Sequence, residues 1–181
     1  MSRYLVLLSG GIDSAVVLAS LRGNERAAVG FDYGQPHRIE LDHAARFAAA
    51  EGVPFEVVTL PPIPKVDDIV FAARNAVLIS FGASIAASRQ FDAVAIGSNF
   101  SDWQDFPDCR PEFVKSIAQA IRYAYGVYVV APLLRMSKAE VVRKATALGL
   151  DLAALWTCYA PRDGNPCGEC YACKAREAAG A

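Results

Sequence analysis

The sequence predicts an α/β fold in which a doubly wound parallel sheet of about five strands is covered by helices on both faces. Short apolar stretches alternate along the chain with longer helix-forming stretches, which is the order that builds a parallel sheet. The composition agrees, because 54% of the 181 residues are hydrophobic and 20% are charged. We predict an α/β domain over residues 1–150 and a C-terminal segment over residues 151–181.

In the first half of the chain, the pattern predicts strands that alternate with two helices. The strands are the apolar runs Tyr4–Leu8, Ala27–Phe31 and Phe55–Leu60. Helix-forming residues fill Ala15–Leu21, and Gly23 follows as the residue that ends this helix. A second helix is expected to begin at Pro36, because proline suits the first helical position, and to end at Glu51.

In the second half, a Pro-rich loop begins at Pro61, and helices again alternate with strands. The expected helices are Asn75–Ser88, Pro111–Tyr125 and Ser137–Leu148, and the expected strands are Ala93–Gly97 and Val127–Val130. Ser137 and Glu140 form a capping box that predicts the start of the last helix. Ligands of parallel sheets bind at the carboxyl ends of the strands, so the loops after three of the strands should meet there. These loops are Ser9–Ser14, Asp32–Arg38 and Ser98–Arg110.

The turn after the first strand, S-G-G-I-D-S from Ser9 to Ser14, predicts a phosphate site. The first N–H groups of a helix lack partners there, and glycine lets a phosphate approach the backbone closely. The helix dipole contributes only about 0.3–1 kcal/mol per charge, so a bound pyrophosphate also requires several N–H bonds, cationic side chains and Mg²⁺. The turn lacks the lysine of a Walker A loop, and the chain lacks the dinucleotide pattern G-x-G-x-x-G.

Four cysteines near the C-terminus have the spacing C-x8-C-x2-C-x2-C, which predicts a metal site. They are Cys158, Cys167, Cys170 and Cys173. Four thiolates at this spacing suit a closed, structural Zn²⁺ site, whereas an iron–sulfur cluster is the alternative that uses the same ligands. The segment could also be a zinc knuckle that binds a partner. The fifth cysteine, Cys109, is interpreted either as a buried packing residue or as part of a pocket.

The loop Ser98–Arg110 carries carboxylates among aromatic side chains. These are Asp102, Asp105 and Asp108 with Phe100, Trp103 and Phe106. A carboxylate can bridge the N1–H and 2-amino groups of a guanine-like ring, and aromatic rings can stack on it. A solvated acidic loop is the plainer interpretation. No general base is assigned, because His37 and His43 are interpreted as helix-surface or partly buried residues.

Charge and hydropathy exclude several classes of protein. The 18 basic and 19 acidic residues give a formal net charge of −1, which argues against a dedicated nucleic-acid-binding protein. No apolar run is long enough for a membrane span, and Asp13 interrupts the apolar start of the chain before a signal peptide is complete. We therefore expect a cytoplasmic protein with reduced cysteines.

Several motifs occur in the order found in the 7-cyano-7-deazaguanine synthase family, which the sequence resembles over nearly its whole length. They are SGGIDS, FDYGQPHRIEL, RNAVLIS, DFPDCRPEFVKSI, APLLRMSKAEV and TCYAPRDGNPCGECYACKAR. The first motif is also similar to the pyrophosphate loop of N-type ATP pyrophosphatases, enzymes that cut ATP between its α and β phosphates. The pairing of this loop with the four-cysteine segment makes the resemblance specific.

The resemblance implies an ATP-dependent ligase that converts 7-carboxy-7-deazaguanine and ammonia into 7-cyano-7-deazaguanine in queuosine biosynthesis. The carboxylate is adenylated and aminated, and the resulting amide is adenylated in turn and eliminated to the nitrile. The resemblance also implies a homodimer, structural Zn²⁺, Mg²⁺ with ATP, and the N-type ATP pyrophosphatase fold for residues 1–150.

The motifs and the resemblance together assign the site residues. We expect catalytic roles for Asp13, Lys138 and Arg74. ATP and pyrophosphate binding is assigned to Leu8, Ser9, Gly10, Gly11, Ile12, Asp13, Ser14, Arg38 and Lys138. Substrate binding is assigned to Arg74, Asn75, Asp102, Asp105, Phe106, Asp108 and Arg110. The metal ligands are the four cysteines named above.

Because of two departures from the family pattern, the sequence does not decide which acceptor molecule is modified. Ala72-Ala73 stand where the family typically has Pro-Gly, and Gln104–Arg110 differs from the family's S-G-Y-P-D-C-R. One alternative is a related enzyme that stops at the amide or modifies another deazapurine, a protein or a tRNA. Another is a non-catalytic module that binds ATP and zinc.

Overall fold

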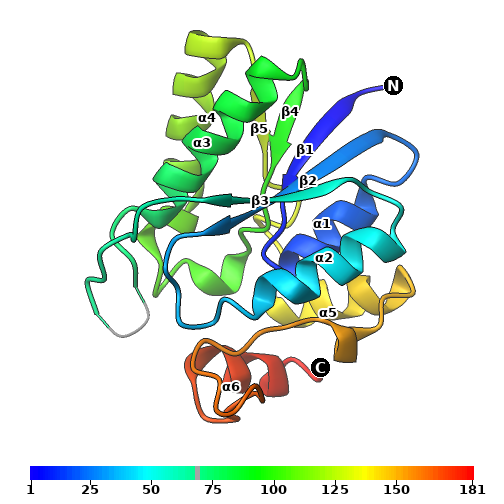
Figure 1. The fold of residues 1–181 in the computed structure, drawn as a ribbon, viewed down its shortest axis with the longest axis vertical. Helices are drawn as coiled ribbons and strands as arrows, with labels where there is room; N and C mark the ends of the chain where they lie inside the picture. The colour runs from blue at the N-terminus through cyan, green and yellow to red at the C-terminus, as the bar shows by residue number, and fades with distance from the viewer. Residues whose placement is uncertain (68–69) are drawn as a thin grey trace.

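The computed structural model describes residues 1–67 and 70–181, and it contains a five-stranded parallel sheet (Figure 1). The strand order is β3-β2-β1-β4-β5, with all neighbours parallel. The strands are β1 (Arg3–Leu7), β2 (Glu25–Asp32), β3 (Phe55–Thr59), β4 (Ala93–Ala95) and β5 (Tyr128–Val130). The predicted doubly wound α/β fold is therefore confirmed. Two residues of the predicted Pro-rich loop, 68 and 69, lie outside the described residues.

Helices cover both faces of the sheet, as Figure 1 shows. They are α1 (Ile12–Ser20), α2 (Glu40–Ala50), α3 (Arg74–Ser88), α4 (Pro111–Tyr125), α5 (Lys138–Ala147) and α6 (Tyr171–Ala178). One apolar core lies between the sheet and the α3–α4 layer, and it contains Val94 and Ile79. The other lies between the sheet and the layer of α1, α2 and α5, and it contains Val6, Val16 and Val141. Both faces of the strands are thus buried, which explains their continuous apolar runs.

The capping box predicted for α5 is present. The Ser137 side chain accepts from the Glu140 backbone N–H, and the Glu140 carboxylate accepts from the Ser137 backbone N–H at 2.7 Å. The helix consequently begins at Lys138, which fixes the position of that side chain at the edge of the sheet.

The helix predicted from Pro36 begins four positions later, at Glu40. The reason lies in Gln35, whose side chain accepts from the Tyr33 backbone N–H at 2.8 Å and donates to the Phe31 carbonyl at 2.9 Å. These bonds hold the chain after β2 in a turn, so the prediction for the start of this helix was wrong. The turn also buries His37, which is only 4% exposed, instead of leaving it on a helix surface.

Ala73 adopts a left-handed conformation with φ +51° immediately before α3. A left-handed backbone costs a residue with a Cβ roughly 1–2 kcal/mol, whereas glycine adopts it freely. This is the second position of Ala72-Ala73, where the resemblance predicts glycine. The chain therefore keeps the expected backbone turn with a less favourable residue.

The last helix, α6, was not predicted. It follows the cysteine spacing, and Ala172 is its one buried side chain. Three short 3-10 helices, at Phe100–Asp102, Pro107–Cys109 and Leu152–Ala154, were not predicted either. Among the described residues, no helix has the length and hydropathy to cross a bilayer.

Candidate active site and metal centre

The turn that begins at Ser9 joins β1 to α1 as predicted, but α1 begins at Ile12 instead of Ala15, so Ile12, Asp13 and Ser14 form its first turn. Gly10 has φ +91°, and a Cβ at this position would lie 2.1 Å from the carbonyl oxygen of Glu40. Only glycine therefore lets the turn lie against the start of α2. Ser14 donates through its hydroxyl to the Gly11 carbonyl at 3.1 Å, and Ser9 donates through its backbone N–H to the Ser14 hydroxyl at 3.2 Å.

Two apolar side chains anchor this turn in the core. Leu8 and Ile12 are each 1% exposed, so any contact of theirs with a nucleotide must come from the backbone. At the other side of the turn, a Cβ on Gly97 would lie 3.0 Å from the Ser14 backbone nitrogen. The ends of β1 and β4 therefore lie close to the first turn of α1. The Ser9–Ser14 turn, called the phosphate-type turn below, lies at the end of β1.

Asp13, in the first turn of α1, forms an ion pair with Lys138 at the start of α5. The Lys138 Nζ lies 2.5 Å from Asp13 Oδ2, and both side chains are mostly buried. The second oxygen, Asp13 Oδ1, is buried and has no hydrogen-bond partner. A buried carboxylate oxygen without a donor suits a hard cation such as Mg²⁺, so this residue fits the metal that accompanies ATP. Two of the three predicted catalytic residues, Asp13 and Lys138, are thus brought together.

A cavity of about 200 Å³ opens at the carboxyl ends of the strands. All three loops that the sequence predicts to meet contribute to its wall: Ser9 and Asp13 from the first, His37 from the second, and Asp102 from the third. Arg74 and Asn75, from the start of α3, line it too.

Burial shapes the charge of this cavity. Burial and the nearby Asp13 carboxylate together raise the pKa of Asp102 to about 6, while Lys138 opposes the shift. Asp102 Oδ2 accepts from Asn99 Nδ2 at 2.7 Å. Arg74 is held beside Tyr33 and Tyr159, and its guanidinium remains charged because its pKa lies above the ordinary value.

Other predicted site residues lie outside the cavity wall and have structural partners. Asp108 accepts from the Asn75 backbone N–H at 3.0 Å and so caps α3. Arg110 donates to the Trp103 carbonyl at 2.7 Å, and Phe106 is buried against Tyr171.

Arg38 and Asp105 also lie outside that wall. Arg38 forms an exposed ion pair with Asp32, with 2.5 Å between Nε and Oδ2. Asp105 shares a hydrogen bond with Tyr171 of α6, and burial together with this bond raises the pKa of Tyr171. Both residues therefore have partners within the chain.

Sequence reasoning missed part of the wall. Tyr33, His37, Glu40 and Tyr159 line the cavity, and none of them was assigned a role there. Three of them belong to the motif FDYGQPHRIEL, which could have marked them because it follows a strand. Tyr159 follows a predicted metal ligand, and its place in the cavity depends on how the C-terminal segment folds back. Cys109 also lines the cavity, and burial raises the pKa of its thiol to about 12.

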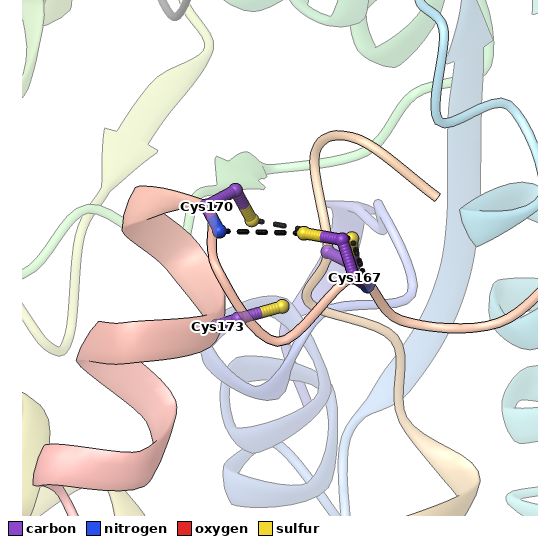
Figure 2. A group of neighbouring side chains, drawn as sticks. Cys167, Cys170 and Cys173 are labelled. Atoms are coloured by element: carbon purple, nitrogen blue, oxygen red, sulfur yellow. Dashed lines mark hydrogen bonds between the residues drawn. The ribbon is translucent and has the colours of Figure 1, made fainter. Parts of the chain in front are cut away.

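The four predicted cysteine ligands form one cluster, in which all sulfur atoms lie within 4.8 Å of one another. Figure 2 shows Cys170 and Cys173 at the beginning of α6, with their sulfurs on the side of Cys167. Backbone N–H groups of Glu169 and Cys170 donate to the Cys167 sulfur at 3.4 and 3.3 Å. These bonds lower the pKa of Cys167 to about 6, so its thiolate is available at neutral pH. The donor set fits a metal ion.

The C-terminal segment docks directly on the phosphate-type turn. The Trp156 backbone N–H donates to the Gly10 carbonyl at 2.9 Å, and His43 Nδ1 donates to the Ala154 carbonyl at 2.7 Å. Arg176 of α6 donates to the Leu155 carbonyl at 2.8 Å. The cysteine cluster and the cavity are therefore parts of one continuous structure (Figure 1).

Comparison with known proteins decides the family. The family model described as queuosine biosynthesis protein QueC matches residues 3–68 and 64–180. This chain belongs to the QueC family. A relative from Leptospira interrogans serogroup Icterohaemorrhagiae, a 7-cyano-7-deazaguanine synthase, is 32% identical over 97% of this chain and 85% of its own length. Another synthase with this name, from Sphingopyxis alaskensis, is 36% identical over 95% of this chain and 90% of its own length.

The QueC chain also resembles solved structures at the level of the fold. A U34-tRNA thiolase, NcsA from Methanococcus maripaludis with its [4Fe-4S] cluster, has a TM-score of 0.65 at 18% identity. The likeness covers 98% of this chain and 64% of the thiolase. NMN synthetase from Francisella tularensis has a TM-score of 0.54 at 14% identity, over 93% of this chain and 71% of the synthetase. The family resemblance stated from the motifs is confirmed.

Proposed function

We propose that this protein is a 7-cyano-7-deazaguanine synthase, an ATP-dependent ligase that turns 7-carboxy-7-deazaguanine and ammonia into the nitrile. Family membership supports the overall reaction, because the curated relatives have this name and the match covers most of their length. The observation that carries the mechanism is the Asp13–Lys138 pair, which sits at a glycine-rich turn beside a cavity with room for an acceptor.

The chemistry requires activation of a poor leaving group. The substrate carboxylate attacks the α-phosphorus of ATP, the bond to the β-phosphate oxygen breaks, and pyrophosphate departs. In this mechanism, the N–H groups of the Ser9–Ser14 turn and the ammonium of Lys138 hold the departing pyrophosphate. Asp13 would hold the Mg²⁺ that accompanies ATP, and this ion would supply positive charge to the phosphates.

Amination and dehydration follow on the activated acid. Ammonia attacks the acyl carbon, AMP leaves with one carboxylate oxygen, and an amide results. A second adenylation, on the amide oxygen, makes that oxygen a leaving group, and loss of AMP with the nitrogen's protons gives the nitrile. We assign Asp102 to the ring edge of the acceptor and Arg74 to its carboxylate, because both line the cavity.

We propose that the cysteine cluster holds one structural Zn²⁺. A Zn–S bond of about 2.3 Å in tetrahedral geometry sets the ligand sulfurs about 3.8 Å apart. The sulfur of Cys158 lies 3.5 Å from that of Cys167 and 3.9 Å from that of Cys170. A four-iron cluster places several metal atoms between its thiolates and requires wider spacing. The observed sulfur spacing therefore favours a single ion.

We further propose that the enzyme works in the cytoplasm, where reducing conditions keep such thiolates available for the metal. Residues outside the cavity wall, such as Asp108 and Arg110, would support the acceptor loop rather than touch the acceptor. The homodimer implied by the resemblance stays a prediction.

A pyrophosphate-release assay tests the reaction. Purified protein is incubated with Mg-ATP, with and without 7-carboxy-7-deazaguanine and ammonium, and the product is identified by mass spectrometry. We expect pyrophosphate release that depends on the acid, about two AMP per product as the scheme requires, and a nitrile product. An amide as the sole end product would favour the amide-forming alternative. ATP binding without acid-dependent pyrophosphate release would contradict an enzymatic function.

A further inference from the structure

The proposed reaction leaves one requirement without an assigned residue, namely an acceptor for protons. Nitrogen enters as ammonium with four protons and leaves as a nitrile with none, while both carboxylate oxygens leave on AMP. Every N–H proton must therefore be transferred to a base. The residues assigned above, Asp13, Lys138, Arg74 and Asp102, are occupied with phosphate, metal or acceptor.

The cavity contains a second polar pair that the proposed function does not use. His37 and Glu40 both line it, and His37 Nε2 lies 3.6 Å from Glu40 Oε1. The side chain of His37 is 5% exposed and that of Glu40 is 12% exposed. The other ring nitrogen, His37 Nδ1, is buried and has no hydrogen-bond partner. A buried polar atom without a partner is costly, so its presence in a cavity wall points to a ligand.

The backbone holds His37 and Glu40 close to the phosphate-type turn, where the acid is proposed to be activated. Glu40 is the first residue of α2, and its carbonyl group is the one that lies against Gly10 of the phosphate-type turn. Gln35 Nε2 donates to Glu40 Oε1 at 3.2 Å and so orients the carboxyl group. The ring of Tyr159 lies 5.1 Å from that of His37, centre to centre, and limits the movement of the imidazole.

We propose that His37 and Glu40 form the subsite that receives the amino nitrogen and accepts its protons, an inference that rests on the proposed function. His37 Nδ1 accepts an N–H proton of the ammonium-derived nitrogen, and the Nε2–H proton passes to Glu40. One N–H bond breaks and one imidazole N–H forms, while the second imidazole N–H is replaced by a carboxyl O–H. No oxidant or further reactant is needed.

The surrounding charges suit such a relay. Burial and the nearby Arg74 together lower the pKa of His37 to about 4, while the Tyr159 backbone opposes the shift, so the imidazole is neutral. Burial raises the pKa of Glu40 to about 8, while Gln35 and Arg74 oppose the shift. The carboxylate of Glu40 therefore binds a proton more tightly than the imidazole does, and the relay requires the ionised form of Glu40, which predominates above about pH 8.

The test separates acid activation from amination by changing the nucleophile. Glu40→Gln is compared with wild type in acid-dependent ATP–pyrophosphate exchange, in hydroxamate formation with hydroxylamine, and in product formation with ammonium. Hydroxylamine is already neutral at neutral pH and needs no proton acceptor before it attacks. Glu112→Gln, on the exposed surface of α4, is the matched control.

We expect Glu40→Gln to retain exchange and hydroxamate formation within about threefold and to lose about 10²–10⁴-fold of the ammonium-dependent rate. Ammonium-dependent turnover that remains within threefold of wild type overturns the proposal. Equal loss of all three activities in a folded variant also overturns it, because Glu40 would then serve ATP or acceptor binding.

A second variant covers the case in which Glu40→Gln does not fold. His37→Gln should give the same separation between ammonium and hydroxylamine, and thermal unfolding with a metal assay monitors its integrity. Retention of ammonium-dependent turnover in this variant overturns the relay. Wild-type protein without acid-dependent exchange contradicts the proposed function itself, whereas a variant that uses ammonium normally contradicts this inference alone.

Discussion

The α/β region and the C-terminal segment, residues 151–181, are stabilised by different interactions. In the α/β region the strands are covered on both faces, and side chains such as Val6 and Val94 are fully buried. In the C-terminal segment only Leu155, Trp156, Cys158 and Ala172 are buried. The first region can fold through the hydrophobic effect, whereas the second buries too little apolar surface to do so.

This difference shows how the two halves of the site depend on each other. The α/β region supplies the turn, the Asp13–Lys138 pair and most of the cavity wall. The C-terminal segment supplies Tyr159, directly after Cys158 of the cysteine cluster. The segment that carries the cysteine cluster therefore completes a cavity that the α/β region builds. Four substitutions test whether the two regions are stabilised separately.

The largest effect is expected from Cys170→Ser. Structural zinc contributes about 10–16 kcal/mol of binding free energy in small zinc domains, so loss of one thiolate should remove the metal and unfold the segment. We expect metal content near zero by atomic emission, rapid proteolysis beyond Trp156 and loss of turnover. Cys109→Ser, outside the cluster, should keep the metal. A metal-free Cys170→Ser protein with normal activity would contradict the structural role.

The next largest effect is expected from Asp13→Ala, which changes the α/β region instead of the C-terminal segment. Removing the carboxylate leaves Lys138 without its partner and removes a proposed Mg²⁺ ligand, so AMP formation should fall about 10²–10³-fold. The metal content and the proteolysis pattern should match wild type. Asp42→Ala, exposed on α2, is the control. Loss of the metal from Asp13→Ala would show that the two regions are not separable.

A smaller effect is expected from Arg176→Ala, which weakens the docking of α6 without touching a ligand. The guanidinium donates to the Leu152 carbonyl at 2.5 Å and to the Leu155 carbonyl at 2.8 Å. Hydrogen bonds from a charged donor contribute about 1.5–3 kcal/mol. The free energy of local opening around residues 152–157, measured by hydrogen exchange, should therefore fall by a similar amount. Lys174→Ala, exposed on the same helix, should leave exchange unchanged.

The smallest effect is expected from Ser137→Ala, within the α/β region. Loss of the capping hydroxyl costs about 1 kcal/mol, measured as a lower free energy of unfolding in urea. The metal content should not change, because the cap is remote from the cysteine ligands in the chain and belongs to the region with an apolar core. Ser116→Ala, whose hydroxyl donates to a carbonyl within α4, serves as the comparison.

The sequence predicted well those features that depend on local pattern. Apolar runs located the strands, the S-K-A-E capping box located the start of α5, and the order of the strands placed three loops at one edge. The spacing of the cysteines predicted their cluster because two-residue gaps bring sulfurs together within one turn of chain.

Features that depend on distant contacts could not be predicted. Even the local start of α2 was missed, because the Gln35 side chain bonds to the backbone of Tyr33 and Phe31 and the apolar pattern does not record these bonds. Asp108, which is predicted to bind substrate, also accepts a hydrogen bond from the Asn75 backbone N–H because its loop folds back onto α3, and the sequence does not show this bond. Tyr159 reaches the cavity only after Trp156 has bonded to Gly10, a contact between residues far apart in the chain.

That last contact has a consequence for the newly made protein. Ribosomes release the chain from its N-terminal end, so the turn at Gly10 emerges long before Trp156 and Tyr159. Both aromatic residues follow every strand of the described sheet. A partly translated chain can therefore contain the Ser9–Ser14 turn while it still lacks Tyr159, which completes the cavity wall. The cavity wall can therefore be completed only after the segment from Trp156 to Tyr159 has left the ribosome.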